Sequence, residues 1–233
     1  MAARGMSYFF IGAAIMLIMI AGIVHSLPDP KASCGVKSFA WTEPSLVARS
    51  AQPSIASLAC LCYADFAAVV NLRHESVGYN EAAVIKALGM EYLLLPIIDD
   101  TAPSPKQVSD YMTFINDHRR KCASVLTHDA AGRGRMGAMD GIYLLWKGWT
   151  TAEVFERYIN FGAKIDCENG GNGQIQLLHE IGLLLGRGDA WPVGMDHYGN
   201  SWEHCPRPGY MATWDYSTIE FPPYTATHCQ SQS

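Results

Sequence analysis

The residues best suited to chemistry lie in one stretch, His128 to Gly137, which has the sequence His-Asp-Ala-Ala-Gly-Arg-Gly-Arg-Met-Gly. A strand-like run, Ala123 to Thr127, precedes it, and a mostly apolar, helix-like run from Ala138 to Trp146 follows. A Gly-rich turn at a helix start directs backbone N–H groups inward and adds partial positive charge. An Arg at the end of the turn can donate two hydrogen bonds to an oxyanion. The spacing indicates an anion-binding loop, although a strand-to-helix turn without a ligand has similar spacing.

This stretch resembles the signature loop of the cysteine-dependent protein tyrosine and dual-specificity phosphatases, H-C-x-x-G-x-x-R-[S/T]-G. His128, Gly132, Arg135 and Gly137 match that pattern in register. The resemblance implies a loop that binds phosphate through its backbone and its arginine. The anion-binding residues that it implies are Ala130, Ala131, Gly132, Arg133, Gly134 and Arg135.

Two departures from the family pattern fall on its chemistry. Asp129 stands at the position of the nucleophilic Cys, and Met136 stands at the position of a Ser or Thr that assists the thiolate as a leaving group. The Cys acts as a thiolate of lowered pKa and forms a phospho-enzyme. A carboxylate differs in reach and geometry, and its fixed charge repels a dianionic phosphate. Aspartyl-phosphate chemistry relies on Mg²⁺ and further carboxylates that this loop lacks.

We therefore expect no catalytic residues and interpret Asp129, Arg135, Asp99 and His128 as vestigial positions of the family's active site. Arg135 is present although its catalytic partner is absent. We expect the Asp129 carboxylate to replace the missing phosphate. It would lie at the mouth of the loop, near the loop N–H groups and in a charge-assisted, bidentate pair with Arg135.

The resemblance assigns the general acid to the loop after a strand at Met90 to Ile98. Asp99 aligns with the Asp that protonates the leaving group, and Asp100 is its neighbour. The same residues have a purely structural interpretation. Asp-Asp-Thr-Ala-Pro-Ser-Pro is ordinary loop sequence, in which Thr101 or Ser104 can cap a helix that runs from Pro105 to about His118.

Three further segments carry the resemblance. They are the R-S-A-Q-P turn at 49–53, the apolar V-V-N-L-R strand at 69–73 and the G-W-T-T-A-E-V turn at 148–154. The resemblance covers about Ser38 to Gly162, roughly half of the chain. Helical patterns at 55–63, at 80–88 before Gly89, and at 173–185 before Gly186 complete a β-α-β-α-β-α-α order. This order predicts an α/β fold with a phosphatase-like, mostly parallel sheet flanked by helices.

The N-terminus indicates membrane attachment. Residues Tyr8 to Val24 carry no charge, and with their flanks they make about 20 residues, enough for a helix to span a bilayer. A signal peptide cleaved before Leu27 is the alternative. We expect a retained transmembrane anchor at 1–26, a linker at 27–37, a phosphatase-like domain at 38–188 and a C-terminal extension at 189–233. The weak charge bias favours a single-pass protein whose bulk lies on the non-cytoplasmic side, in a bacterial envelope or an organelle inner membrane.

The amino-acid composition limits the classes of binding partner that we expect. A net charge of −5 without a basic block argues against nucleic acid. Charged residues make up only 17%, which indicates surface covered by lipid or by other subunits. No cofactor motif is present, and we expect no cofactor.

Seven cysteines allow disulfides if the domain faces an oxidising compartment, and Cys205–Cys229 is the pair that we expect first. His204-Cys205 and His228-Cys229 match no standard zinc spacing, so we expect no metal site. The segment from Asp189 to Ser233 is rich in Trp, Tyr and Pro without a period, which predicts an irregular arm ordered by contact with a partner chain.

Together these features predict a membrane-anchored pseudophosphatase that serves as a structural or accessory subunit of a larger membrane complex. One alternative is a regulatory module that binds phosphate or phosphoproteins. Another is an active tyrosine or dual-specificity phosphatase with an unusual loop.

Overall fold

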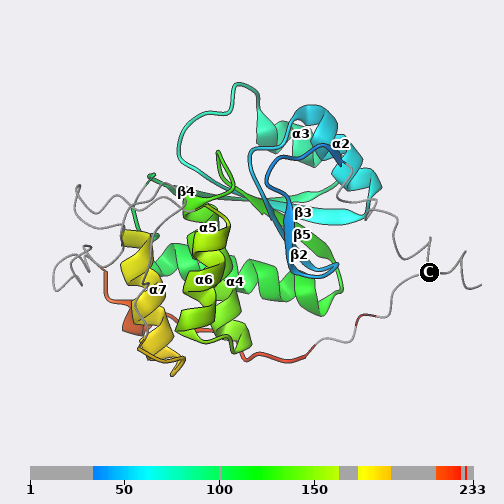
Figure 1. Ribbon diagram of the computed structural model, residues 1–233. Coiled ribbons are helices and arrows are strands. Elements are labelled where there is room, and N and C mark those ends of the chain that lie inside the picture. The colour runs from blue at the N-terminus through cyan, green and yellow to red at the C-terminus, as the bar shows by residue number, and fades with distance from the viewer. Residues whose placement is uncertain (1–33, 100, 163–172, 190–213, 227–228, 230–233) are drawn as a thin grey trace, which may run out of the picture.

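The computed structural model describes residues 34–99, 101–162, 173–189, 214–226 and 229 (Figure 1). The elements are β1 (Ala40–Glu43), β2 (Val47–Ser50), α2 (Ile55–Tyr63), β3 (Phe66–Arg73), α3 (Glu81–Ala87), β4 (Glu91–Ile97), α4 (Pro105–Arg120), β5 (Ser124–His128), α5 (Gly134–Lys147), α6 (Thr151–Asn160), α7 (Gly173–Leu184) and η3 (Tyr216–Thr218).

The five strands form one mixed sheet in the order β1-β2-β5-β3-β4. The pairs β2–β5, β5–β3 and β3–β4 are parallel, as expected, whereas β1 runs antiparallel to β2. The short return from β1 to β2 includes Ser45 in a left-handed conformation. Because β2, β3, β4 and β5 run the same way, their carboxyl ends meet at one edge of the sheet, where the signature loop follows β5.

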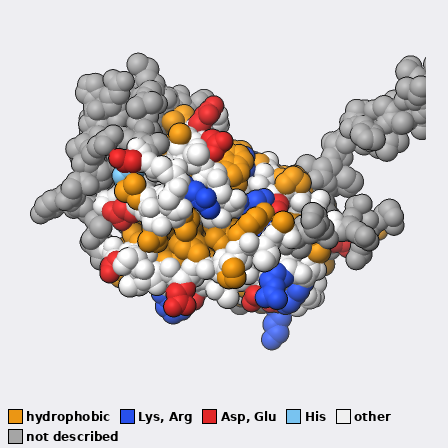
Figure 2. Space-filling view, turned by 90° about the horizontal axis from the view of Figure 1, so that it is seen from below, with side chains coloured by type: hydrophobic (Ala, Val, Ile, Leu, Met, Phe, Trp, Pro, Cys, Tyr) orange, Lys and Arg blue, Asp and Glu red, His pale blue; other side chains and the backbone are white. Residues whose placement is uncertain are grey.

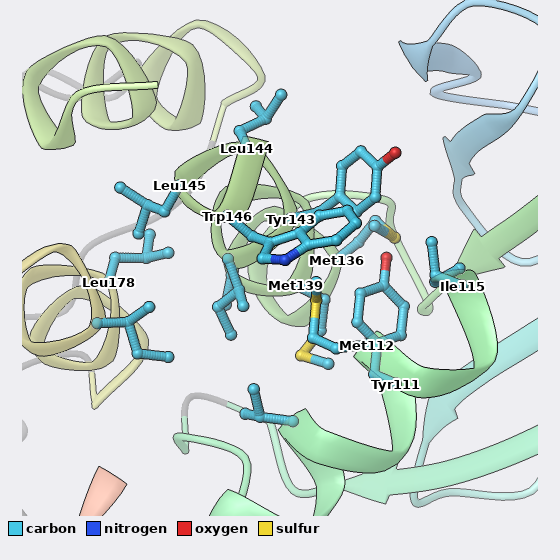
Figure 3. Packing of buried hydrophobic residues seen from close by; sticks show 14 of the residues in the cluster. Tyr111, Met112, Ile115, Met136, Met139, Tyr143, Leu144, Leu145, Trp146 and Leu178 are labelled. Atoms are coloured by element: carbon cyan, nitrogen blue, oxygen red, sulfur yellow. The ribbon is translucent and has the colours of Figure 1, made fainter. Parts of the chain in front are cut away.

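Helices cover both faces of the sheet. Helices α2 and α3 lie on one face, and α4, α5, α6 and α7 lie on the other (Figure 1). Helix α5 is the centre of the larger layer, and its residues from Arg135 to Trp146 are all buried. Figure 3 shows Met139 of α5 pointing towards Met112 and Tyr111 of α4, with Leu178 of α7 on the other side of α5. A helix enclosed in this way needs apolar side chains on all sides, which explains its weakly amphipathic sequence.

Local capping determines where several helices begin. Ser104 accepts a hydrogen bond from the N–H of Gln107, and Thr150 accepts one from the N–H of Glu153. In each pair the longer side chain accepts a hydrogen bond in return from the N–H of the capping residue. These reciprocal bonds satisfy donors that a helix start leaves without a partner. Of the two candidate caps before α4, Ser104 and not Thr101 caps the helix, and the predicted helix from Pro105 is confirmed.

The cysteine pairing differs from our expectation. Cys229 is bonded to Cys122, not to Cys205, and a second disulfide joins Cys34 to Cys60. The prediction was wrong because it paired two cysteines outside the family-like region, whereas the C-terminal segment returns to the end of α4. Cys205, His204 and His228 lie outside the described residues.

The described part of the C-terminal arm, 214–226 with Cys229, lies against the domain itself (Figure 1). The Tyr216 hydroxyl donates to the carbonyl of Pro103 at 2.9 Å, and the Trp146 indole donates to the carbonyl of Pro222 at 2.6 Å. The Tyr224 ring packs edge-on against Trp146. These residues were expected to lie on a partner chain, but they cover an aromatic patch of their own domain.

Among residues 34–99, 101–162, 173–189, 214–226 and 229, no helix is long and apolar enough to cross a membrane. The predicted anchor at 1–26 lies outside the described residues, as does most of the predicted linker. Cys34 to Lys37, at the end of that linker, already contact the domain, because Cys34 is bonded to Cys60 and the Lys37 carbonyl accepts the N–H of Ala51. Within the described part, no group of three or more His, Cys, Asp or Glu residues is placed to hold a metal.

Candidate active-site loop

The loop from Asp129 to Arg133 joins the buried end of β5 to the first turn of α5. Gly132 has a φ of +76°, and a Cβ there would lie 2.7 Å from the backbone nitrogen of Ala51. The turn therefore requires glycine both for its conformation and for its close approach to the chain after β2. Ala130, Ala131 and Arg133 are exposed at the mouth of the loop, whereas Asp129 and Arg135 are buried.

The Asp129 carboxylate binds backbone N–H groups of the loop, as predicted, but it is buried within the loop and does not lie at its mouth. Its Oδ1 accepts the backbone N–H groups of Ala131, at 2.9 Å, and Gly132, and its Oδ2 accepts the N–H of Met136 at 3.0 Å. The side chain is only 2% exposed. Three N–H donors that could face an anion in this kind of loop are thus bound to a negative charge that the chain itself supplies.

The predicted bidentate pair of Asp129 with Arg135 is wrong. The Arg135 guanidinium makes its two-pronged contact with Glu75, with both N–O distances at 2.8 Å, and also donates to the carbonyl of Ile97 at 3.1 Å. The Arg135 guanidinium contacts Glu75, which follows β3, and the carbonyl of Ile97 at the end of β4. The Asp129 carboxylate binds backbone N–H groups of the loop instead.

The Glu75–Arg135 pair is strongly coupled. The hydrogen bonds from Arg135 hold the pKa of Glu75 at about 2. Burial by itself lowers the pKa of Arg135, but Glu75, together with the charges of Asp99 and Asp129, raises it overall. No sequence motif indicated Glu75 in advance. It lies two residues beyond the N-L-R segment that ends β3, and that position at the carboxyl edge of a parallel sheet was a usable signal.

The structure brings Asp99 to the loop. Its Oδ1 lies 3.3 Å from Nε of Arg135, and its side chain is 70% exposed. An exposed carboxyl group beside the loop is compatible with the general-acid position that the resemblance assigned to it. Asp100, its neighbour, lies outside the described residues.

His128 belongs to a buried polar cluster beneath the loop. Its Nε2 lies 3.3 Å from Oε1 of Glu81, and both residues are 3% exposed or less. The same carboxylate accepts hydrogen bonds from Gln52 of the R-S-A-Q-P turn and Asn71 of the N-L-R strand, and from Tyr92 of β4. The motif residues that resemble the phosphatases therefore meet around Glu81, a residue that the sequence patterns did not single out.

We expect this cluster to make the fold sensitive to acid. Burial by itself raises the pKa of Glu81, but His128 and the hydrogen bonds from Gln52 and Tyr92 lower it to about 2. A carboxyl group with a lowered folded-state pKa stabilises the fold fully above its unfolded pKa, near 4.5. That contribution, about 3 kcal/mol, is lost as the pH falls from about 4.5 to about 2.

Urea unfolding of the full chain in mild detergent, followed by near-UV circular dichroism between pH 7 and pH 2, measures this effect. Glu81→Gln should flatten the fall in unfolding free energy over that pH range. Glu156→Gln, on the exposed side of α6, serves as the control. An unchanged pH profile in Glu81→Gln would show that Glu81 does not carry the acid sensitivity.

A second buried cluster holds the loop backbone from the side. Arg49 is fully buried, and it donates to the carbonyl of Gly132 at 2.6 Å and to Oδ2 of Asp140 at 3.0 Å. Asp140 also accepts hydrogen bonds from Arg157, at 3.0 Å, and from Thr42. The arginine of the R-S-A-Q-P turn thus positions the turn of the signature loop, and Asp140 on α5 holds that arginine.

Met136 and Gly137 connect the loop to the core. The Met136 side chain is fully buried in the cluster of Figure 3. A Cβ at Gly137 would lie 2.5 Å from the ring of Tyr158. The Tyr158 hydroxyl donates to Oε1 of Gln174 on α7, and Gln174 also donates to the carbonyl of Thr101. Glycine at position 137 is therefore needed for packing, and an apolar side chain at position 136 replaces the hydroxyl of the family pattern.

Comparison with known proteins agrees with this geometry. A family model described as PTP-NADK, a DSP-PTPase phosphatase fused to NAD+ kinase, matches residues 37–160, which include Asp129, Arg135, Asp99 and Glu75. No curated protein matches the chain.

Among solved structures, the active form of Tk-PTP shares 26% identity with a TM-score of 0.53, covering 63% of this chain and 97% of its own. PTPMT1 in complex with PI(5)P has 19% identity and a TM-score of 0.56, covering 64% and 97%. The DUF442 protein from Shewanella putrefaciens CN-32 has 20% identity and a TM-score of 0.51, covering 64% and 93%. The last two support the fold alone. Because the family model spans more than half of the chain and contains the whole loop, the chain belongs to the dual-specificity phosphatase-like family described as DSP-PTPase phosphatase fused to NAD+ kinase.

Proposed function

We propose that this chain is a membrane-anchored pseudophosphatase, a structural or accessory subunit of a larger membrane complex. The proposed loss of catalysis rests mainly on the burial and the hydrogen bonds of the Asp129 side chain. Its carboxylate is buried and accepts three N–H groups of the loop, so the signature loop already encloses a negative charge. A dianionic phosphate entering the loop would have to displace these hydrogen bonds and approach a like charge.

The remaining groups of the site support the same conclusion. Met136 supplies no hydroxyl to assist a leaving nucleophile, and its side chain is buried in the core. Asp129 is not a thiol, so the nucleophile typical of the family is missing. Arg135 stays charged and buried because Glu75 binds both of its terminal nitrogens. Both Asp129 and Arg135 therefore have partners within the chain, as a structural role for the loop requires.

The two disulfides support a location outside the reducing cytoplasm. Disulfides persist in oxidising compartments and are rare in cytosolic proteins. Cys34–Cys60 ties the N-terminal end of the described chain to α2, and Cys122–Cys229 ties the C-terminal segment to the end of α4. With the uncharged segment Tyr8–Val24, they favour a single-pass protein whose domain lies on the non-cytoplasmic side.

The exposed surface of the larger helical layer, α4 to α7, has features that favour binding of a partner subunit. Figure 2 views the molecule from the side of α4 to α7 and shows apolar side chains gathered in the middle of this face, with Lys or Arg side chains among them and further charged side chains nearer its margin. Trp149, Leu183, Leu184 and Trp214 are each between 37% and 49% exposed. Contiguous exposed apolar surface is typical of a binding site for another protein.

We expect the full chain in detergent, with chelator present, to release no phenol from a generic aryl phosphate above the blank. The physical reason is the absence of a thiolate and the charge of Asp129 within the loop. An active cysteine-dependent phosphatase serves as the positive control, and Asp129→Asn tests the aspartate. Robust turnover that is lost in Asp129→Asn would establish an active phosphatase with an unusual nucleophile instead.

A further inference from the structure

Helix α2 has an unusual outer surface. It contains no charged residue, and only Ser57, Leu58 and Leu61 are buried. The outward side chains include Ile55, which is 50% exposed, and Tyr63, which is 93% exposed. A surface helix normally carries polar or charged side chains on its outward face, whereas an apolar outward face indicates a non-aqueous environment.

The neighbouring helix α3 continues this surface. Figure 1 shows α2 and α3 together as the layer that covers one face of the sheet. Ala82, Ala83 and Ala87 of α3 are exposed, and Lys86 is the exposed charged residue among them. Helix α4 of the opposite layer differs, since it presents the ion pair of Lys106 with Asp110 to solvent. Asp65, after the end of α2, and Glu91, at the start of β4, are the exposed acidic groups nearby in the sequence.

The path of the chain limits how far the α2 layer can lie from the uncharged N-terminal segment. Cys34 is bonded to Cys60, so the polypeptide enters the described domain at α2. Only residues 25–33 separate that entry from Val24, the end of the uncharged segment. A chain of that length reaches at most roughly 30–35 Å. If Tyr8–Val24 spans a bilayer, the α2 layer is attached to its surface by a short, disulfide-fixed connection.

We propose that the outer face of α2 and α3, formed by Ile55, Ala56, Ala59, Tyr63 and the alanines of α3, rests on the lipid surface in which the chain is anchored. This inference rests on the proposed membrane anchor. Tyr63 has the ring and the hydroxyl that suit the boundary between headgroups and acyl chains, and Lys86 can pair with lipid phosphate. The face formed by α4 to α7 then points away from the bilayer, where it remains open to a partner subunit.

Site-specific photo-crosslinking tests the contact. The full chain is prepared with p-benzoylphenylalanine in place of Tyr63 and reconstituted into nanodiscs of phosphatidylcholine and phosphatidylglycerol that contain a fluorescent phospholipid. A matched preparation carries the same probe in place of Tyr224, which is 40% exposed on the C-terminal segment of the opposite layer. Irradiation should give at least about tenfold more lipid adduct at position 63 than at position 224.

The outcomes separate the inference from the proposed function. The intact mass shows whether residues 1–26 are retained. If they are retained but lipid labels both positions equally, or if position 63 labels protein instead of lipid, the docking inference is overturned while the anchor stands. If the mature chain begins at Leu27, both the anchor and the docking inference are overturned. A second experiment places the probe at position 55 and compares the chain with and without Tyr63→Glu. The substitution should at least halve the lipid adduct, and an unchanged adduct would contradict the proposal.

Discussion

Replacing two residues of the loop, Asp129→Cys together with Met136→Thr, should give a chain that hydrolyses aryl phosphates, an activity that we do not expect of the unaltered chain. The three backbone N–H groups that now bind the Asp129 carboxylate would be free to lower the pKa of a thiol and to bind phosphate oxygens. Arg135 and Asp99 are already beside the loop. We expect release of phenol to rise at least about 10²-fold over the unaltered chain, because a nucleophile and a positioned acid then act together.

Two further variants in the same background show whether the gain comes from this site. Asp99→Asn should remove a large part of the new activity at neutral pH, since it deletes the proton donor while leaving the thiolate in place. Arg135→Met should remove nearly all of it. A trapped phospho-cysteine, detected by mass spectrometry with Asp99→Asn present, would identify the nucleophile. If the Cys-Thr variant folds but stays at the blank rate, the loop is inactive for a reason beyond the two replaced residues.

Asp140→Ala should lower the free energy of unfolding by about 3–5 kcal/mol, because it leaves a buried arginine without its counter-charge. Arg49 is fully buried and pairs with Asp140 at 3.0 Å, and Arg157 donates to the same carboxylate. The variant should also loosen the loop, because Arg49 holds the carbonyl of Gly132. Urea unfolding measures the stability, and hydrogen exchange of the Gly132 region measures the loosening.

Asp110→Ala is the matched control, since it makes the same substitution in a helix and removes an ion pair of similar length. Lys106 and Asp110 lie 2.6 Å apart, but their side chains are 80% and 40% exposed. Exposed pairs contribute about 0–1 kcal/mol, so this variant should unfold almost like the unaltered chain. An equal loss of unfolding free energy in the two variants would show that burial of the ion pair does not determine the destabilisation and that Asp140 does not anchor the loop.

Local patterns in the sequence were enough to predict most elements and the register of the loop. These local signals act over a few residues. They include the strand patterns at 69–73 and at Met90 to Ile98, the cap at Ser104, and the glycines that follow helices at 89 and 186. Their effects are therefore visible before the chain is folded. The resemblance of His128 to Gly137 correctly placed Asp129 inside a loop between a strand and a helix, because that geometry depends on neighbouring backbone N–H groups.

The pairing of distant groups, in contrast, follows from how the whole chain packs. Arg135 binds Glu75, 60 residues away, and Cys122 binds Cys229, 107 residues away. Such partners are chosen by how strands align at the edge of the sheet and by where a segment returns to the surface. The position of the C-terminal arm also depends on tertiary packing. The sequence predicted that the arm contacts a partner chain, whereas Tyr216 and Tyr224 pack on the arm's own domain. Apolar and aromatic side chains bury themselves wherever complementary surface lies within reach, and the folded domain supplied that surface.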